Sequence, residues 1–244
     1  MRLGHRAYWG FNLYPDAGEG GGCFVPTLRA RPSEGGGAAV DVERSQLEAG
    51  RRAKAKLRRY CAANRLNRFA TLTYAEACFD QEQLRVQVAE FFRGLRRELG
   101  GSPLAYAWVP EWHPGGHGLH VHFAVGQFVP VGLVKGVWGR GIVHIKLIGD
   151  LPTGSGALEE ARAAGRYLAK YVSKSIGDER VPRLHRYEVA QGFQPEKVPL
   201  AGDSDEAVIA QASERMGSEP VVFWRSAEQE GWRGPPAYWC AWAG

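Results

Sequence analysis

The amino-acid sequence predicts an α+β fold with a central antiparallel sheet and helices packed on it. The expected elements follow in the order strand, helix, hairpin, short helix, strand and helix, and a hairpin places consecutive strands antiparallel. The composition is 44% hydrophobic and 23% charged in 244 residues, which is typical of a globular chain with a core. We therefore expect helices on one face of an antiparallel sheet rather than a doubly wound parallel sheet.

The first expected elements are a basic helix over residues 40–65 and a strand at Arg68–Tyr74. The strand sequence RFATLTY alternates in polarity and is rich in threonine and aromatic residues. Asp80 is a typical helix cap, and the apolar residues after it recur at helical spacing until the glycine pair at 100–101. These patterns predict a strand followed by an amphipathic helix.

Two strands at 104–112 and 119–125 flank the sequence HPGGHG at 113–118, which predicts a hairpin. The other expected elements are a short helix at 131–138, a strand at 142–148, a helix at 158–176, a helix at 205–216 and a strand at 221–224.

The chain divides into three expected segments. Residues 1–39 form a glycine-rich N-terminal segment, with 15–37 expected as a loop, and residues 40–180 form the main domain. Residues 181–244 are a C-terminal extension that we expect to pack on this domain. No run of about 18 apolar residues, no apolar leader and no CxxC spacing are present, so we expect a cytoplasmic protein without a membrane span.

The positive charge is concentrated in one helix. The net charge is +5, yet residues 43–68 alone hold nine Lys and Arg against two Glu, while residues 203–230 are acidic. Such a segment can neutralise phosphates, which favours a nucleic-acid partner, although a solvated helix face accounts for it equally well. The candidate contacts to a DNA backbone are Arg51, Arg52, Arg58 and Arg59.

The most informative local pattern is LHVHFAV at 119–125. Side chains alternate along a strand, so His120 and His122 share one face and their apolar neighbours share the other. Two imidazoles on one face can converge on a metal ion. The alternative is a pair of hydrogen-bonded core histidines.

The hairpin turn decides the third ligand. A turn centred on Gly115-Gly116 places Glu111 opposite His120, whereas a turn centred on Gly116-His117 places His113 there. Gly-Gly is the better turn centre, so we expect Glu111. Two histidines and a carboxylate form an open site that suits Mn²⁺ or, more weakly, Mg²⁺.

The helix expected at 158–176 carries the sequence YLAKYVSK from Tyr167. Tyr167, Lys170, Tyr171 and Lys174 cluster on a face nearly opposite the apolar stripe, so we interpret them as functional rather than as core residues. Nearby lysines and a metal favour the phenolate and neutralise phosphate oxygens, as nucleophilic attack on a phosphodiester requires. An exposed face without function is the alternative.

Together, these motifs resemble those of the HUH endonuclease superfamily. The strand at 68–74, the His-hydrophobic-His pair with its upstream glutamate, and the paired tyrosines occur in the order typical of two-tyrosine rolling-circle replication initiators. The YxxKYxxK arrangement is similar to that of single-stranded DNA phage replication proteins, and the chain most resembles initiators of actinobacterial plasmids and integrative elements. The resemblance covers roughly residues 66–180.

The resemblance implies a five-stranded ferredoxin-like or RRM-like sheet with the histidines on a central strand. It also implies nicking of single-stranded or extruded origin DNA by a tyrosine, which leaves a 3′-OH and a 5′-phosphotyrosine, and a host helicase as partner. The implied roles are nucleophile for Tyr167 and Tyr171, metal ligand for Glu111, His120 and His122, and phosphate contact for Lys170.

Two other functions fit the same motifs. A two-tyrosine rolling-circle transposase differs in its target and its genomic neighbourhood. A metal-stabilised single-strand-binding module would stack its tyrosines on bases without cleaving. His144 and Lys146 share a strand face, where we expect a structural role rather than a DNA contact, and Trp108 and Trp112 are expected in the core.

Overall fold

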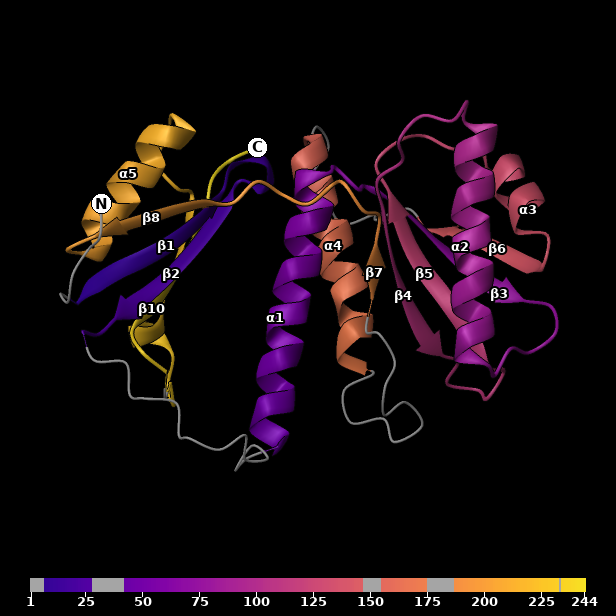
Figure 1. The fold of residues 1–244 in the computed structure, drawn as a ribbon, viewed down its shortest axis with the longest axis horizontal. Helices are drawn as coiled ribbons and strands as arrows, with labels where there is room; N and C mark the ends of the chain where they lie inside the picture. Colours follow the sequence, from indigo (N-terminus) through magenta and orange to yellow (C-terminus); the bar gives the residue numbers. More distant parts are fainter. Residues whose placement is uncertain (1–6, 28–41, 147–154, 175–186, 233) are drawn as a thin grey trace. The chain divides into compact units, whose positions relative to one another are not determined.

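The structure, a computed structural model, describes residues 7–27, 42–146, 155–174, 187–232 and 234–244, with the backbone alone at 42–47, 173 and 174. The chain forms two compact units: Glu43–Gln194, and Met1–Val42 together with Pro195–Gly244. Within the described residues each unit contains one five-stranded sheet (Figure 1).

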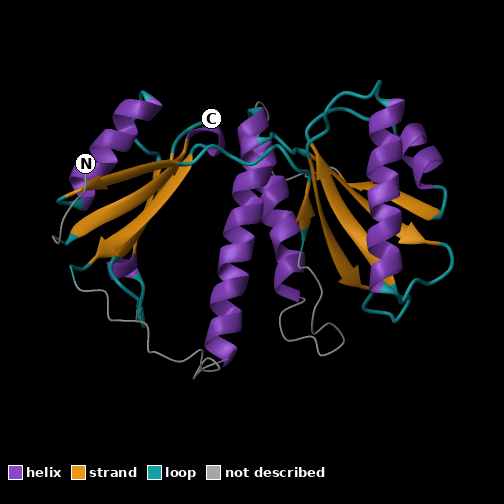
Figure 2. Ribbon diagram, in the orientation of Figure 1, coloured by secondary structure: helices purple, strands orange, loops and turns teal. Residues whose placement is uncertain are grey.

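The sheet of the larger unit is antiparallel throughout, in the order β6–β3–β5–β4–β7 (Figure 2). Its strands are β3 (Arg68–Tyr74), β4 (Tyr106–Trp112), β5 (Leu119–Val125), β6 (Gly141–Lys146) and β7 (Glu188–Val189). The prediction of an α+β fold around an antiparallel sheet of about five strands is confirmed. Strand β5, which carries His120 and His122, lies at the centre of this sheet.

Helices cover both faces of this sheet (Figure 1). One face packs against α2 (Gln81–Glu98) and α3 (Val131–Trp138), and the other against α1 (Val42–Ala63) and α4 (Ala157–Lys174). The expectation of helices on one face only is wrong, because alternate strand positions are apolar in both directions. Leu72 packs in the core with α2, whereas Phe69 packs in the core with α1 and α4.

Helix α2 begins and ends as its sequence predicts. The Asp80 carboxylate accepts hydrogen bonds from the backbone N–H groups of Glu82 and Gln83, at 2.8 and 3.1 Å. Gly100, with φ of +81°, follows the last turn. Its buried residues, which form the core against the sheet, are Leu84, Val88, Phe91, Phe92 and Leu95.

Helices α1 and α4 pack closely where Gly165 faces α1. A Cβ at Gly165 would lie 3.1 Å from the Cβ of Cys61 and 3.2 Å from the Cα of Arg58. The missing side chain therefore allows the two helices to approach each other over the sheet. The expected end of the 158–176 helix, at residues 175–176, lies outside the described residues.

The smaller unit has the strand order β8–β1–β2–β10–β9, with α5 (Asp205–Met216) packed in its core. Its strands are β1 (Tyr8–Tyr14), β2 (Glu19–Val25), β8 (Val198–Gly202), β9 (Val222–Arg225) and β10 (Ala237–Ala241), and its 3₁₀ helices are Pro15–Ala17 and Ser226–Glu228. The expected helix at 205–216 is confirmed.

The glycine-rich segment was expected to be a loop throughout, and this expectation is wrong for strand β2. A side chain at Gly20 would clash with the ring of Phe11, and one at Gly22 would clash with the backbone carbonyl of Gly10. Glycine is therefore present because the neighbouring strand and its aromatic ring fill the space, and not because the segment turns.

The two terminal segments form one sheet. Strand β2 pairs with β10, and β1 pairs with β8, so residues from before 42 and after 195 share a core. This grouping differs from the expected divisions at residues 39 and 180. Residues 188–189 pair with β4 in the larger unit, and the Tyr60 hydroxyl donates to the carbonyl of Ala190 at 3.0 Å.

The hairpin between β4 and β5 depends on Gly118. This residue has φ of +75°, and an added Cβ would lie 2.4 Å from the carbonyl oxygen of Cys78. We expect Gly118→Ala to lower the free energy of unfolding by about 2–4 kcal/mol, measured by urea denaturation, because strain and a backbone clash add together. Gly116→Ala is the control: its φ is +78° but no atom lies within 4 Å, so the loss should be about 1 kcal/mol. Equal losses in the two variants would contradict the role of the Cys78 contact.

Candidate active site

The register of the β4–β5 hairpin aligns a carboxylate with the two histidines. Glu111 pairs with His120 and Val109 pairs with His122, as a turn centred on Gly115-Gly116 predicts. The prediction that Glu111 lies opposite His120 is confirmed. The two imidazoles lie on the face that α1 and α4 cover, since Phe69 and Ala124 of this face pack with those helices.

Three possible ligand atoms converge on this face. Oε2 of Glu111 lies 3.1 Å from Nε2 of His120 and 2.7 Å from Nε2 of His122, and the ligand atoms of the three residues all lie within 4.8 Å of one another. The side chains are only 9, 11 and 7% exposed, in the same order. Two imidazole nitrogens and one carboxylate oxygen suit a divalent ion that accepts mixed nitrogen and oxygen ligands. These residues therefore form a candidate metal-binding triad.

The His122 ring is held from its other side. Oγ1 of Thr71, on the neighbouring strand β3, lies 2.9 Å from Nδ1 of His122. If Nε2 binds a metal, the Nδ1–H group can donate to this hydroxyl, which fixes both the tautomer and the orientation of the ring. Thr71 therefore acts as a positioning residue for the triad.

The Tyr171 ring stacks on His122. The two ring centroids lie 3.7 Å apart at an interplanar angle of 19°, and Tyr171 is 9% exposed. The interpretation that both tyrosines lie away from the apolar stripe is wrong for Tyr171, which shares a core cluster with Leu168 and Val172. Helix α4 packs against both α1 and the sheet, so its buried surface is wider than one apolar stripe predicts.

Tyr167 lies beside Tyr171 in a more polar environment. The Tyr171 hydroxyl donates to the Tyr167 oxygen at 2.9 Å, and Nζ of Lys146 donates to the same oxygen at 2.8 Å. Nζ of Lys146 also lies 4.1 Å from the Tyr167 ring centroid, and Nζ of Lys170 lies 5.4 Å from it. The edge of this ring contacts Phe69 of β3. The Tyr167 oxygen thus accepts two hydrogen bonds, one of them from a cation.

The two phenols are electrostatically unequal. Burial raises the pKa of Tyr167, but the hydrogen bonds from Lys146 and Tyr171 and the charges of Lys146 and Lys170 outweigh it, so the pKa lies below that of an ordinary tyrosine. Burial raises the pKa of Tyr171, and the hydrogen bond to Tyr167 and the charges of Tyr167 and Glu111 raise it further. Tyr167 is therefore the phenol that more readily loses its proton.

Comparison with known proteins identifies one family. Residues 67–176 match the model of the replication-associated protein ORF2 family. This segment, somewhat under half of the chain, contains the triad and both tyrosines. The match supports a replication initiator of the rolling-circle type and implies DNA as a partner. No curated protein and no solved structure matches the chain.

Lys146 is the residue of this site that sequence reasoning undervalued, because a structural role was expected for it. It pairs with Phe69 across strands β6 and β3, and Phe69 contacts Tyr167. Alternation along β6 correctly indicates that Lys146 and His144 share a face. Only the knowledge that β6 pairs with β3 places Lys146 next to the tyrosine helix.

The other histidines of the hairpin lie near the triad. Nδ1 of His113 accepts a hydrogen bond from the Gly115 N–H at 3.0 Å, and the His113 ring lies 5.2 Å from that of His120. The register places Glu111, and not His113, opposite His120. Trp108 is buried in the core with α2, as expected.

The arginines proposed for DNA contact all lie on α1. Arg51 and Arg52 are exposed, Arg58 and Arg59 are half-buried, and Arg52 forms an ion pair with Glu48 at 3.9 Å. The Lys174 side chain lies outside the described residues. Among those residues, no helix has the length and apolar character that crossing a bilayer requires.

Proposed function

We propose that this protein is a rolling-circle replication initiator that nicks and rejoins single-stranded origin DNA through a covalent tyrosine intermediate. The observation that carries the proposal is the direct contact between the tyrosine pair and the triad. Tyr171 stacks on His122 and donates a hydrogen bond to Tyr167, so a phosphate bound at the triad would lie beside both phenols. The family match to a replication-associated protein supports the same function.

The proposed reaction is an in-line attack on a phosphodiester. The tyrosine oxygen forms a bond to phosphorus while the bond to the 3′ oxygen breaks, and that oxygen takes up a proton and leaves as a 3′-OH. The 5′ phosphate stays on the tyrosine, and the reverse reaction joins the ends. A divalent ion such as Mn²⁺ or Mg²⁺, held by Glu111, His120 and His122, would supply Lewis-acid polarisation of the phosphate.

Tyr167 is the first nucleophile in this proposal. Its oxygen accepts hydrogen bonds from Lys146 and Tyr171, an arrangement that favours the phenolate over the phenol. Lys170, which is exposed beside the same ring, is placed to neutralise a phosphate oxygen. Tyr171, which is buried and stacked, would act in the second transfer.

A cleavage assay tests the proposed function. End-labelled single-stranded oligonucleotides that tile the candidate origin are incubated with protein and Mn²⁺, with and without EDTA, and resolved by denaturing electrophoresis. We expect a shorter 3′-OH product and a protein–DNA adduct only when the metal is present. Binding without any cleavage would instead favour a single-strand-binding module.

The variant Lys146→Met tests the order of the two tyrosines. Because a hydrogen bond from a cation to the attacking oxygen is lost, we expect the rate of adduct formation at neutral pH to fall about tenfold or more. The profile of rate against pH should also move to higher pH, since without Lys146 the pKa of Tyr167 rises.

Three comparisons accompany this measurement. Lys146→Arg should restore part of the rate, and Lys135→Met, which removes an exposed lysine on α3, should leave it unchanged. Tyr167→Phe should lose most of the first adduct, whereas Tyr171→Phe should keep it. The reverse order for the two phenylalanine variants would disprove the assignment of Tyr167.

A further inference from the structure

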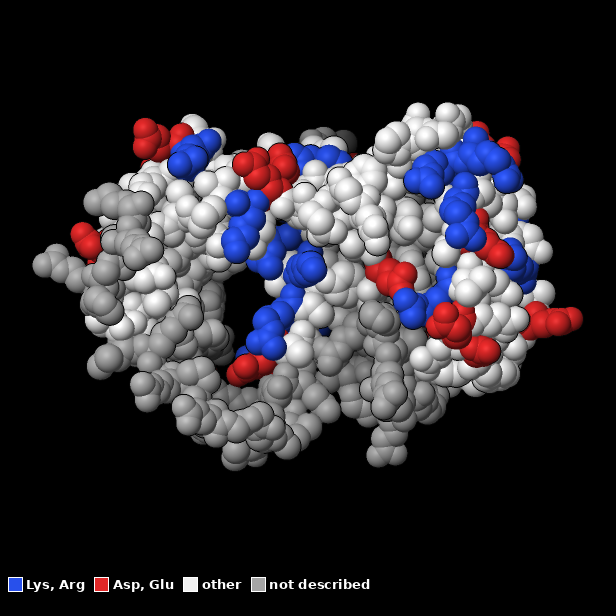
Figure 3. Space-filling model, viewed as in Figure 1, with Lys and Arg blue, Asp and Glu red and all other residues white. Residues whose placement is uncertain are grey.

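A groove between α1 and α4 is lined almost entirely by cations. It has a volume of about 330 Å³, and its two alanines, Ala55 and Ala169, are the uncharged residues that line it. Cationic side chains line it from both helices: Arg51, Lys54 and Arg58 from α1, and Arg166 and Lys170 from α4. The close approach of the helices at Gly165 brings the two sets of charges together. Figure 3 shows Lys and Arg side chains in a column over α1.

No carboxylate neutralises this groove among the described residues. Within that part of the chain, none of the five cations forms an ion pair, and no acidic residue lines the cavity. Lys54 with Arg58, and Arg166 with Lys170, are like-charge pairs four residues apart on a helix, a spacing that destabilises the helix. The groove therefore costs stability, which indicates that these charges serve a ligand and not the fold.

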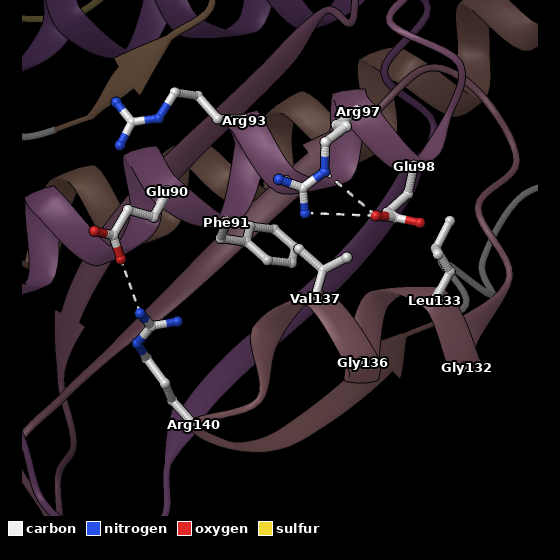
Figure 4. Close-up of a pocket in the computed structure, with 11 residues that line it drawn as sticks. Glu90, Phe91, Arg93, Arg97, Glu98, Gly132, Leu133, Gly136, Val137 and Arg140 are labelled. Atoms are coloured by element: carbon white, nitrogen blue, oxygen red, sulfur yellow. Dashed lines mark hydrogen bonds and ion pairs between the residues drawn. The ribbon is translucent and has the colours of Figure 1, made fainter.

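A second cavity provides a contrast. The cavity between α2 and α3 is larger, about 670 Å³, but its three arginines are accompanied by two glutamates. Arg140 pairs with Glu90 at 2.8 Å and Arg97 with Glu98 at 3.4 Å, which leaves Arg93 as the unpaired charge in this view (Figure 4). Charge, and not size, therefore distinguishes the groove between α1 and α4.

The groove is continuous with the candidate active site. Lys170 lines the groove, and its Nζ also lies 5.4 Å from the Tyr167 ring centroid. Along α1 the three cations span seven residues, or about 10 Å of helix. Helix α1 lies outside residues 67–176, so the match to the replication-associated family does not include this wall of the groove.

We propose that the groove between α1 and α4 binds the phosphate backbone of the DNA strand that extends from the scissile phosphate. The inference rests on the proposed function, because that function places the scissile phosphate at Tyr167. The lining offers cations and small alanines but no aromatic ring and no amide, so the groove holds the backbone without reading the sequence. Binding there neutralises phosphates and releases counterions.

The test measures the salt dependence of binding to single-stranded DNA. A labelled oligonucleotide of mixed sequence is titrated with protein by fluorescence anisotropy over a range of salt concentrations, in a Tyr167→Phe/Tyr171→Phe background that cannot form an adduct. We expect Arg51→Ala/Lys54→Ala/Arg58→Ala to reduce the slope of log K against log salt by about 2, since each lost contact to a single strand contributes about 0.7. Its melting temperature should not fall, because alanine favours helix and like-charge repulsion is relieved.

The matched control removes the same number of charges from the other side of the sheet. Arg93→Ala/Arg96→Ala/Arg97→Ala alters three exposed arginines of α2, and we expect its slope to equal that of the parent. Equal slopes for the groove variant and the parent would overturn the proposal, as would equal reductions in the two triple variants. A slope difference without any adduct in the wild-type cleavage assay would instead retain the groove and reject the tyrosine chemistry.

Discussion

The double variant Tyr167→Phe/Tyr171→Phe loses the covalent protein–DNA adduct, by at least about a thousandfold, while its affinity for single-stranded DNA stays close to that of the wild type. The reason is that phenylalanine removes the attacking oxygen but keeps the ring. The stack of residue 171 on His122 and the edge contact of residue 167 with Phe69 can both persist. Denaturing electrophoresis after incubation with labelled DNA measures the adduct, and fluorescence anisotropy measures the affinity.

Two controls make this result specific. Tyr8→Phe, which removes a phenol from strand β1 of the smaller unit, should leave adduct formation unchanged. The melting temperature of the double variant should stay near that of the wild type, which separates loss of chemistry from loss of fold. An undiminished adduct in the double variant would refute the assignment of both tyrosines.

The second large effect is expected from the metal triad. EDTA should abolish nicking, and excess Mn²⁺ should restore it. Glu111→Gln should keep the shape of the side chain but remove a charged ligand, so nicking should fall by about two to three orders of magnitude. The same variant should bind Mn²⁺ more weakly, because an amide is a poorer ligand than a carboxylate for a divalent ion.

A measurement independent of activity accompanies this prediction. An ion that binds the native state stabilises it, by about 2.7 kcal/mol when its free concentration is a hundred times its Kd. Mn²⁺ should therefore raise the melting temperature of the wild type and of Glu90→Gln, whose carboxylate pairs with Arg140 instead, but not that of Glu111→Gln. A rise of equal size in all three proteins would show that the ion binds elsewhere.

The metal triad was predictable from the sequence because its determinants are local. Alternation along a strand places His120 and His122 on one face, and the turn chemistry of Gly115-Gly116 fixes the register that brings Glu111 opposite. The element order was predictable for a similar reason, since the helix that begins after Asp80 carries its own cap and its own apolar period.

The remainder of the site depends on contacts between distant segments. Thr71 and Lys146 become relevant only because β3 lies between β5 and β6, an arrangement that strand periodicity does not specify. The burial of Tyr171 was missed because a helix that packs against two surfaces buries more than one stripe. Strand β2 was missed because its glycines resemble a loop until the ring of Phe11 is known to fill the space above them.

The face-to-face contact of Tyr171 with His122 has a consequence for engineering. An imidazole that tilts to accommodate an ion of another radius must carry the adjoining aromatic ring with it, and through that ring's hydroxyl the neighbouring phenol as well. Selection for a different ion and selection for a different order of strand transfer would therefore act on one shared stack, so neither property can be altered while the other is left untouched.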